Sequence, residues 1–163
     1  MKNVYRVLAY SITAMVFFQA AAIAFGVFTV DNQVENGAVF SSDSATNLGQ
    51  NLHGIGGTLV IPILALLFLI ASFFVRVPGT VKWAALVLAL VALQITLAFL
   101  AFSVPALGAL HGMNALAILA TSAYAGRRVS RTAPHDVSGA QTPAERAETR
   151  SRARLLGRRR SSV

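Results

Sequence analysis

The chain has 163 residues, of which 55% are hydrophobic and only 12% are charged, and its formal net charge is +8. This composition excludes an ordinary soluble domain of this size and indicates an integral membrane protein. The chain has no cysteine, which excludes disulfides, thiolate-held iron–sulfur clusters and covalently attached c-type haem. The strong nitrogen ligands that remain are His53, His111 and His135.

Four apolar segments predict membrane-spanning helices over about residues 7–30, 52–75, 81–102 and 106–125. The first has about 24 residues, and roughly 20 suffice to cross the hydrocarbon core of a bilayer. A cleavable signal peptide would have a shorter apolar region. The stretch "AIAFGVFTV" is only a weak match to a cleavage site. We therefore expect the first segment to be retained as a span.

The connections between these segments predict their arrangement. "RVPGTVK" and "SVPALGA" are so short that each must return the chain directly, which makes the helices on either side antiparallel neighbours. The predicted fold is an all-α, up-down transmembrane four-helix bundle over residues 1–126. In the longer first loop, "SSDS" offers helix-capping residues, so the second helix is expected to begin near Ser44. Pro62 is expected to kink that helix below His53.

The charged residues predict the orientation in the membrane. The first loop carries acidic residues and no Lys or Arg, whereas the other flanks of the spans are basic. The positive-inside rule then puts both termini in the cytoplasm of a multi-pass protein of the cell membrane. The basic residues on that side are Lys2, Arg6, Arg76, Lys82, Arg127, Arg128 and Arg131.

Residues 127–163 are predicted to form a disordered, basic cytoplasmic tail. Its arginines either attract anionic lipid headgroups or simply remain solvated and reinforce the topology. Basic charge alone is not a nucleic-acid recognition motif, so no nucleic-acid partner is expected. His135 lies in this tail and is expected to be solvated.

The few polar residues inside the predicted spans form a repeat. A helix with a glutamine is followed by a helix with "LHG", first as Gln19 and His53, then as Gln94 and His111. The order and the membrane orientation are the same both times, so the two hairpins are candidates for a relation by an axis along the membrane normal. The similarity rests on few positions, and chance remains an alternative.

The two histidines are the candidate metal ligands. His53 and His111 lie on diagonal helices, roughly 11 to 14 Å apart if neighbouring axes are about 8 to 10 Å apart. Two imidazoles can ligate haem iron axially, and an ionisable residue within the membrane is a candidate functional residue. We therefore predict a haem b site with His53 and His111 as axial ligands and with Gln19, Gln94 and Asn114 as hydrogen-bonding neighbours. Small residues leave room for it: Gly54, Gly57, Gly108 and Gly112.

An alternative explanation needs no cofactor. Each histidine would hydrogen-bond to a glutamine or to a backbone carbonyl of a neighbouring helix, and the glycines would let helices pack closely. The chain would then be a non-catalytic membrane scaffold or partner-binding protein. Copper or zinc is less well supported, because no further residues complete a recognisable ligand set. The sequence also has no motif of a hydrolase, a nucleotide-binding loop or an H-E-x-x-H metalloprotease.

The segment "LQITLAFLAFSVPALGALHGMNALAIL" resembles the third and fourth helices of a half-bundle of the haem A synthase family. It is similar, more loosely, to four-helix b-type cytochromes. In those proteins histidines on the second and fourth helices face a haem, and the resemblance maps these onto His53 and His111. The core from Tyr5 to Gly126 also resembles an uncharacterised family of small four-span membrane proteins from actinobacteria, with "LHG" and "PALGALHG" stretches. That second resemblance implies no activity.

The departures from haem A synthase limit what the resemblance implies. That family has two such halves and an acidic residue in its first helix, whereas this chain has one half and Gln19. It also lacks an outer-loop cysteine pair. Oxidation of a haem substituent is therefore poorly supported. The prediction is a haem b holder that passes single electrons, as a homo-oligomer or with a redox partner protein.

Overall fold

The computed structural model describes residues 1–41 and 43–131. All the secondary structure in these residues is helical, which confirms the prediction of an all-α protein. The predicted tail from residue 132 onward, including His135, lies outside the described residues.

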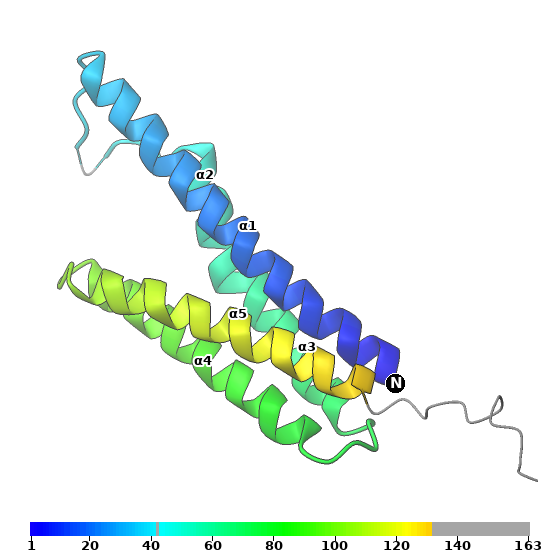
Figure 1. Cartoon of the computed structure of the whole chain (residues 1–163). Helices are drawn as coiled ribbons and strands as arrows, with labels where there is room; N and C mark the ends of the chain where they lie inside the picture. Colours follow the sequence, from blue (N-terminus) through cyan, green and yellow to red (C-terminus); the bar gives the residue numbers. More distant parts are fainter. Residues whose placement is uncertain (42, 132–163) are drawn as a thin grey trace, which may run out of the picture. The chain divides into compact units, whose positions relative to one another are not determined.

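The helices follow one another along the chain with three short or medium connections (Figure 1). α2 and α3 are joined without a break by a π-helical turn, η1, so that Leu48–Ser72 forms one long helix. The bounds are α1 Lys2–Glu35, α2 Leu48–Ile55, η1 Gly56–Val60, α3 Ile61–Ser72, α4 Thr80–Ala101 and α5 Leu107–Arg131.

Three of the described helices are long and apolar enough to cross a membrane: Lys2–Glu35, Leu48–Ser72 and Thr80–Ala101. At about 1.5 Å per residue, even the shortest of them exceeds the roughly 30 Å of a hydrocarbon core. The fourth predicted span falls within α5, which has 25 residues but is not among these three. Polar residues such as His111, Asn114 and Ser122 lower the hydropathy of α5.

The second long helix begins later than predicted. Its first residue is Leu48 and its N-cap is Asn47, so the expected start near Ser44 is wrong. The Asn47 side chain accepts a hydrogen bond from Gln50 N at 3.0 Å, and the Gln50 side chain accepts one from Asn47 N at 3.0 Å. This reciprocal capping box satisfies two backbone donors, which explains why it defines the helix start rather than the serines upstream.

The helix changes geometry between His53 and Pro62. Residues Gly56–Val60 form the π turn, and Pro62 lies in the first turn of α3 directly after it. Proline has no backbone N–H and its ring crowds the carbonyl four residues earlier, so a regular α-helical ladder cannot continue through this point. The kink expected near Pro62 thus takes the form of a π-helical turn, which leaves Leu48–Ser72 as one continuous helix.

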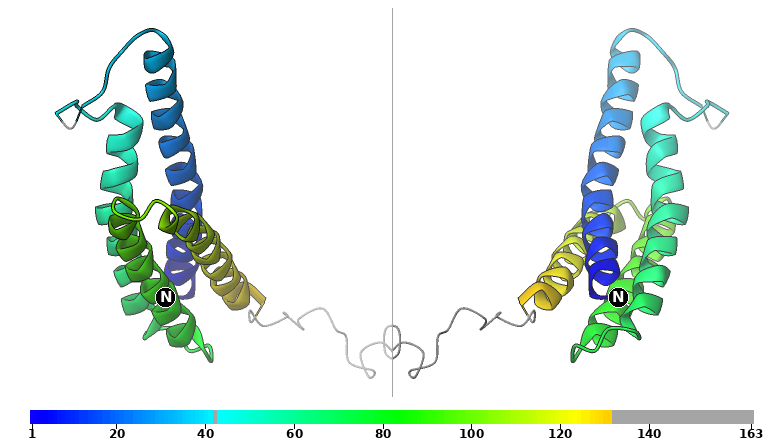
Figure 2. Two further views of the ribbon diagram at one scale, coloured as in Figure 1. Left: turned by 90° about the vertical axis from the view of Figure 1, so that its left-hand side faces the viewer. Right: turned by 90° about the vertical axis from the view of Figure 1, so that its right-hand side faces the viewer.

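The helices pack most tightly toward the end at which the N-terminus lies. There α1 contacts α3 and α5, and α4 contacts α3 and α5. In Figures 1 and 2, the α1–α2 pair and the α4–α5 hairpin separate toward their loop ends. The core between them is built largely from small and β-branched side chains around one aromatic pair: Tyr5, Ala9, Ile12, Ala65, Phe68, Ala84, Val87, Ile118 and Ala125.

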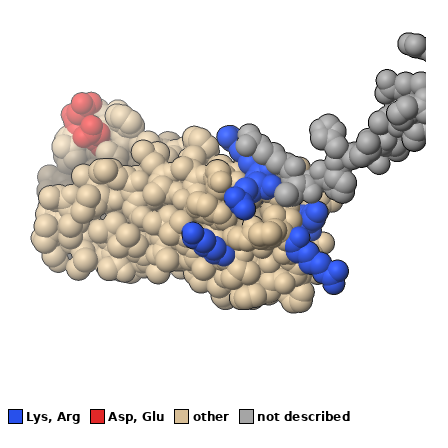
Figure 3. Space-filling view, turned by 60° about the horizontal axis from the view of Figure 1, so that its bottom comes forward, with Lys and Arg blue, Asp and Glu red and all other residues tan. Residues whose placement is uncertain are grey.

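The charged side chains lie at opposite ends of the described helices. Lys and Arg gather at one end and Asp and Glu at the other in Figure 3. Arg128 donates a hydrogen bond to Pro78 O at 3.1 Å, which joins the end of α5 to the α3–α4 turn on the basic side. Asp31 and Glu35 lie in the last turns of α1, at the other end. Many large hydrophobic side chains are exposed between these ends, among them Phe17, Phe28 and Leu67, as expected for helices that contact lipid.

Candidate cofactor-binding site

A cavity of about 690 Å³ lies where the two helix pairs separate. All four long helices line it, and most of its lining is apolar. Four buried residues that belong to the core lie on its inner side: Val16, Ile61, Val91 and Ile118. The polar residues that line it are Gln19, His53, Thr58, Gln94 and His111. The cavity is within the size range of small-molecule and cofactor sites, about 300–1,000 Å³.

His53 is held by α1. Its Nδ1 lies 3.1 Å from the backbone O of Gln19. A carbonyl oxygen only accepts, so Nδ1 carries the proton and donates it. In the neutral ring Nε2 is then unprotonated and has a free lone pair. No hydrogen bond to this Nε2 is found within residues 1–41 and 43–131.

His111 is held in the same way by α4. Its Nδ1 donates to the backbone O of Gln94 at 3.1 Å, which fixes the same tautomer. In both hairpins the histidine therefore bonds to the backbone carbonyl of the glutamine on the preceding helix, at the same distance. The sequence repeat of glutamine and "LHG" is thus matched by a repeated contact.

The side chains beyond the histidines differ between the two hairpins. Gln94 Nε2 lies 3.1 Å from His111 Nε2 and, because that ring nitrogen is unprotonated, the amide donates to it. Asn114 Nδ2 donates to Gln94 Oε1 at 2.7 Å and to Leu90 O at 2.9 Å. Asn114 is only 8% exposed, so this chain of hydrogen bonds orders Gln94 from a buried anchor.

Gln19 does not contact His53 through its side chain. Its Nε2 donates to Leu52 O at 3.3 Å, and its Oε1 is buried without a hydrogen-bond partner. Gln19 is 6% exposed and lines the cavity. The residue three positions after His53 is Gly56, where Asn114 stands three positions after His111. The first hairpin therefore lacks the amide that orders the glutamine of the second.

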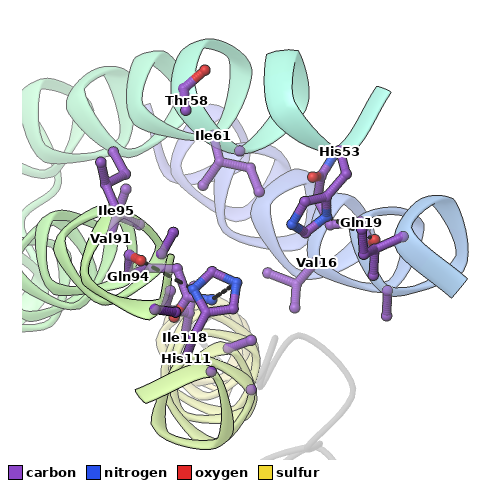
Figure 4. A pocket seen from close by; sticks show the side chains of 18 of the residues that line it. Val16, Gln19, His53, Thr58, Ile61, Val91, Gln94, Ile95, His111 and Ile118 are labelled. Carbon is purple, nitrogen blue, oxygen red and sulfur yellow. Dashed lines mark hydrogen bonds between the residues drawn. The ribbon is translucent and has the colours of Figure 1, made fainter. Parts of the chain in front are cut away.

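The two imidazole rings meet in the cavity. Their centres are 6.1 Å apart and their planes are inclined by 66°. Figure 4 shows them entering the same space from α2 and α5, which are not adjacent along the chain. The sequence predicted that these two helices are diagonal partners. The two histidine side chains extend into the space between them.

The glycines near the histidines divide into two groups. A side chain at Gly54 or Gly112 would meet no atom within 4 Å, and both positions line the cavity. Gly57 and Gly108 also line it and have only ordinary contacts at 3.6 and 4.0 Å. By contrast, a side chain at Gly56 would overlap the Gln19 amide. Among these five, only Gly56 lies in close contact with a neighbouring helix, and the atoms that it meets are those of the Gln19 side-chain amide.

Sequence reasoning missed the apolar side of the site. Val16, Ile61, Val91 and Ile118 are ordinary aliphatic residues in apolar spans, and nothing in their spacing distinguishes a cavity wall from a core position. Thr58 also lines the cavity, but its hydroxyl donates to Gly54 O within its own helix at 2.6 Å. No group of three or more His, Cys, Asp or Glu side chains converges in the part of the chain that the structure describes.

Comparisons with protein-family models, with curated proteins and with solved structures each gave no match. The function is therefore inferred from the geometry of the site.

Proposed function

We propose that the chain is a four-span membrane protein that binds haem b between His53 and His111 and transfers single electrons. Bound haem would supply a one-electron redox centre with both axial positions taken by imidazole. The observation that carries the proposal is the meeting of two histidines with the same tautomer in one apolar cavity.

The separation of the rings supports a shared metal atom. A metal bound to both Nε2 atoms from opposite sides would put the ring centres roughly 6.3 Å apart, since metal–imidazole bonds are about 2.0–2.1 Å and a ring nitrogen lies about 1.1 Å from the ring centre. The observed separation is 6.1 Å. The ring centres are therefore close enough for both imidazoles to reach one metal atom.

The hydrogen bonds at Nδ1 also fit ligation. A metal-binding histidine usually donates its other ring N–H to a carbonyl or carboxylate, which fixes the ring and raises its basicity. Gln19 O and Gln94 O accept these bonds here. Two protein ligands suffice for haem, whereas a structural zinc ion takes four.

The glycines support a large, flat ligand. Gly54 and Gly112 are each the residue after a histidine, and neither is needed for contact between helices. Glycine inside a helix costs about 0.5–1 kcal/mol relative to alanine. Space for a ligand beside each ring would account for that cost.

The proposed topology is an up-down four-helix bundle with both termini in the cytoplasm. Three helices are long and apolar enough to span, and α5, which has 25 residues, packs against α1 and α4. The basic residues lie at one end and the acidic residues at the other, which supports the orientation by the positive-inside rule. The lipid bilayer is then the surrounding solvent of the described helices.

A visible absorption spectrum of the full-length protein, produced with ample haem, tests the proposal. His53→Ala and His111→Ala should each weaken or abolish the haem bands, because each removes one of two axial ligands. The double variant should lose little more haem absorption than the worse single variant, since the effects of groups that act as a unit are not additive. His135→Ala, outside the described residues, is the matched control and should leave the bands unchanged. A colourless wild-type protein would refute haem binding.

A non-catalytic scaffold is the second candidate, and one observation favours it. The contacts of Gln94, Asn114 and His111 are of the kind that orders helices in a membrane without a cofactor. In that case His111→Ala should lower thermal stability in haem-free protein by about 1–3 kcal/mol, the cost of leaving a buried partner unsatisfied. His53→Ala should have a smaller effect, because only its Nδ1 is bonded.

A further inference from the structure

We propose that the two ligands are not equivalent: His111 is a displaceable ligand, and its departure lets the site bind a small neutral diatomic molecule such as carbon monoxide. This inference rests on the proposed haem site. It follows from the different surroundings of the two Nε2 atoms.

Gln94 competes for the lone pair with which His111 would bind a metal. Its amide donates to His111 Nε2 at 3.1 Å, so ligation requires this hydrogen bond to break. His53 Nε2 has no such competitor in the described residues, and the Gln19 amide donates instead to Leu52 O. His53 is therefore the stronger ligand of the pair.

Asn114 maintains the competition. Its amide donates to Gln94 Oε1 at 2.7 Å and thereby directs the other end of the Gln94 amide to His111. Asn114 is itself fixed by its bond to Leu90 O, on the same helix as Gln94. When His111 leaves the metal, Gln94 is already in position to receive it.

The exchange needs no redox partner. The bond between the metal and His111 Nε2 breaks, the Nε2 lone pair accepts the Gln94 N–H, and the incoming molecule donates its own lone pair to the open position. No electron or proton is transferred. The ring would turn aside to leave room for the incoming molecule, while its bond from Nδ1 to the Gln94 backbone O keeps it beside Gln94.

The cavity provides space beside His111. Gly112 and Gly108 line it on α5, and a side chain at Gly112 would meet nothing within 4 Å. Ala98 and Ala115, which are also small, line the same cavity. A neutral diatomic molecule partitions into the apolar bilayer, so it can reach this lining without crossing a charged surface.

Carbon monoxide titration of the reduced, haem-loaded, full-length protein tests the inference. The wild-type spectrum should change on addition of the gas. Gln94→Leu removes the competing amide but keeps the backbone carbonyl that holds Nδ1, so His111 should bind more firmly. The gas concentration at half-saturation should then rise roughly three- to tenfold, the net worth of one hydrogen bond. Asn114→Ala should act in the same direction. Thr96→Val is the matched control on α4, because Thr96 is exposed and its hydroxyl donates to Ala92 O of its own helix.

The single histidine variants should differ in direction. His111→Ala should retain some haem and bind carbon monoxide at a lower concentration than wild type, whereas His53→Ala should lose most of its haem. In haem-free protein, the ¹⁵N signal of His111 Nε2 should show an accepted hydrogen bond that Gln94→Leu removes. A coloured wild-type protein that ignores carbon monoxide would overturn this inference alone, as would a Gln94→Leu titration equal to that of Thr96→Val. Colourless protein would overturn the haem site and this inference together.

Discussion

At the scale of single residues, the glycines near the histidines differ in what lies beside them. Some face open space that a ligand could fill, and one faces a neighbouring helix. Gly54 and Gly112 meet nothing that a side chain would disturb, whereas Gly56 lies against Gln19. A scaffold would gain stability if the first two glycines were replaced by residues with better helix propensity. In a cofactor site the same change would lower the affinity for the cofactor.

Gly112→Leu is expected to weaken haem binding while leaving the haem-free protein at least as stable as wild type. The added side chain fills the cavity beside His111, and overfilling costs about 1–3 kcal/mol, which is roughly 5- to 150-fold in affinity. Haem titration and thermal unfolding measure the two effects. Ala120→Leu, an exposed position of the same helix outside the cavity lining, is the matched control. Equal haem affinity in the two variants would contradict a ligand beside Gly112.

Sequence reasoning identified which residues are polar inside the spans but not which of their atoms are engaged. The repeat of glutamine and "LHG" predicted that these residues act together, and the structure brings both histidines to one cavity. The anchors, however, are the backbone carbonyls of Gln19 and Gln94. Every residue has a backbone carbonyl, so side-chain identity carries no signal for such a contact.

At the scale of the elements, α1 and α2 approach so closely that their backbones touch. A side chain at Gly49 would overlap backbone atoms of Gly26 and the carbonyl oxygen of Ala22. Backbone atoms cannot rotate away as a side chain can. Two glycines from different helices therefore fix the distance between α1 and α2 and, through it, the position of His53 against Gln19 O.

Gly49→Ala is expected to destabilise the protein by about 1–3 kcal/mol, the range for overpacking. It should also disturb the bond between His53 and α1. Gly54→Ala, one turn further along the same helix and free of contacts, should be neutral or stabilising by up to about 1 kcal/mol in haem-free protein. Thermal unfolding of the haem-free variants compares them. Equal melting temperatures would contradict a backbone contact at Gly49.

The start of α2 should depend on Asn47. Its side chain accepts from Gln50 N and donates to Gly26 O at 2.8 Å, so it both caps the helix and joins it to α1. Asn47→Ala should cost about 0.5–2 kcal/mol, as for other N-caps. Ser44→Ala should cost less, because Ser44 caps no described helix and its hydroxyl accepts from Ser41 N within the exposed loop. Chemical or thermal unfolding gives the comparison, and a larger loss at Ser44 would be inconsistent with the observed helix start.

The difference between the predicted and observed start of this helix has a physical origin. "SSDS" and "NLGQ" both offer residues that cap helices, and composition alone does not rank them. The site that caps is the one with a partner on another helix, since Asn47 also bonds to α1. The all-helical class was readable from the apolar runs, although α1, with 34 residues, extends well beyond the predicted span of about 24 residues.

At the scale of the whole molecule, the described helices form two pairs with the same polar pattern. Each pair has a glutamine on its first helix whose carbonyl anchors a histidine on its second. One difference between the pairs is Gly56 against Asn114, three residues after the histidine. In the proposed haem site, this departure from symmetry would let the two histidines differ in strength as ligands.

The charges at the two ends predict the orientation of the bundle. Reporter fusions that measure this orientation are the most direct test of the four-span topology. Lys and Arg flank the α3–α4 turn and the end of α5, whereas Asp31 and Glu35 lie near the first loop. Cationic flanks remain in the cytoplasm during insertion. Reporters fused in residues 76–82 or after Val163 should therefore read cytoplasmic, and one near Asn36 should read external. If α5 did not span, the reporter after Val163 would read external while the one in residues 76–82 stayed cytoplasmic. That result would reduce the spans to three and remove His111 from the depth at which it meets His53.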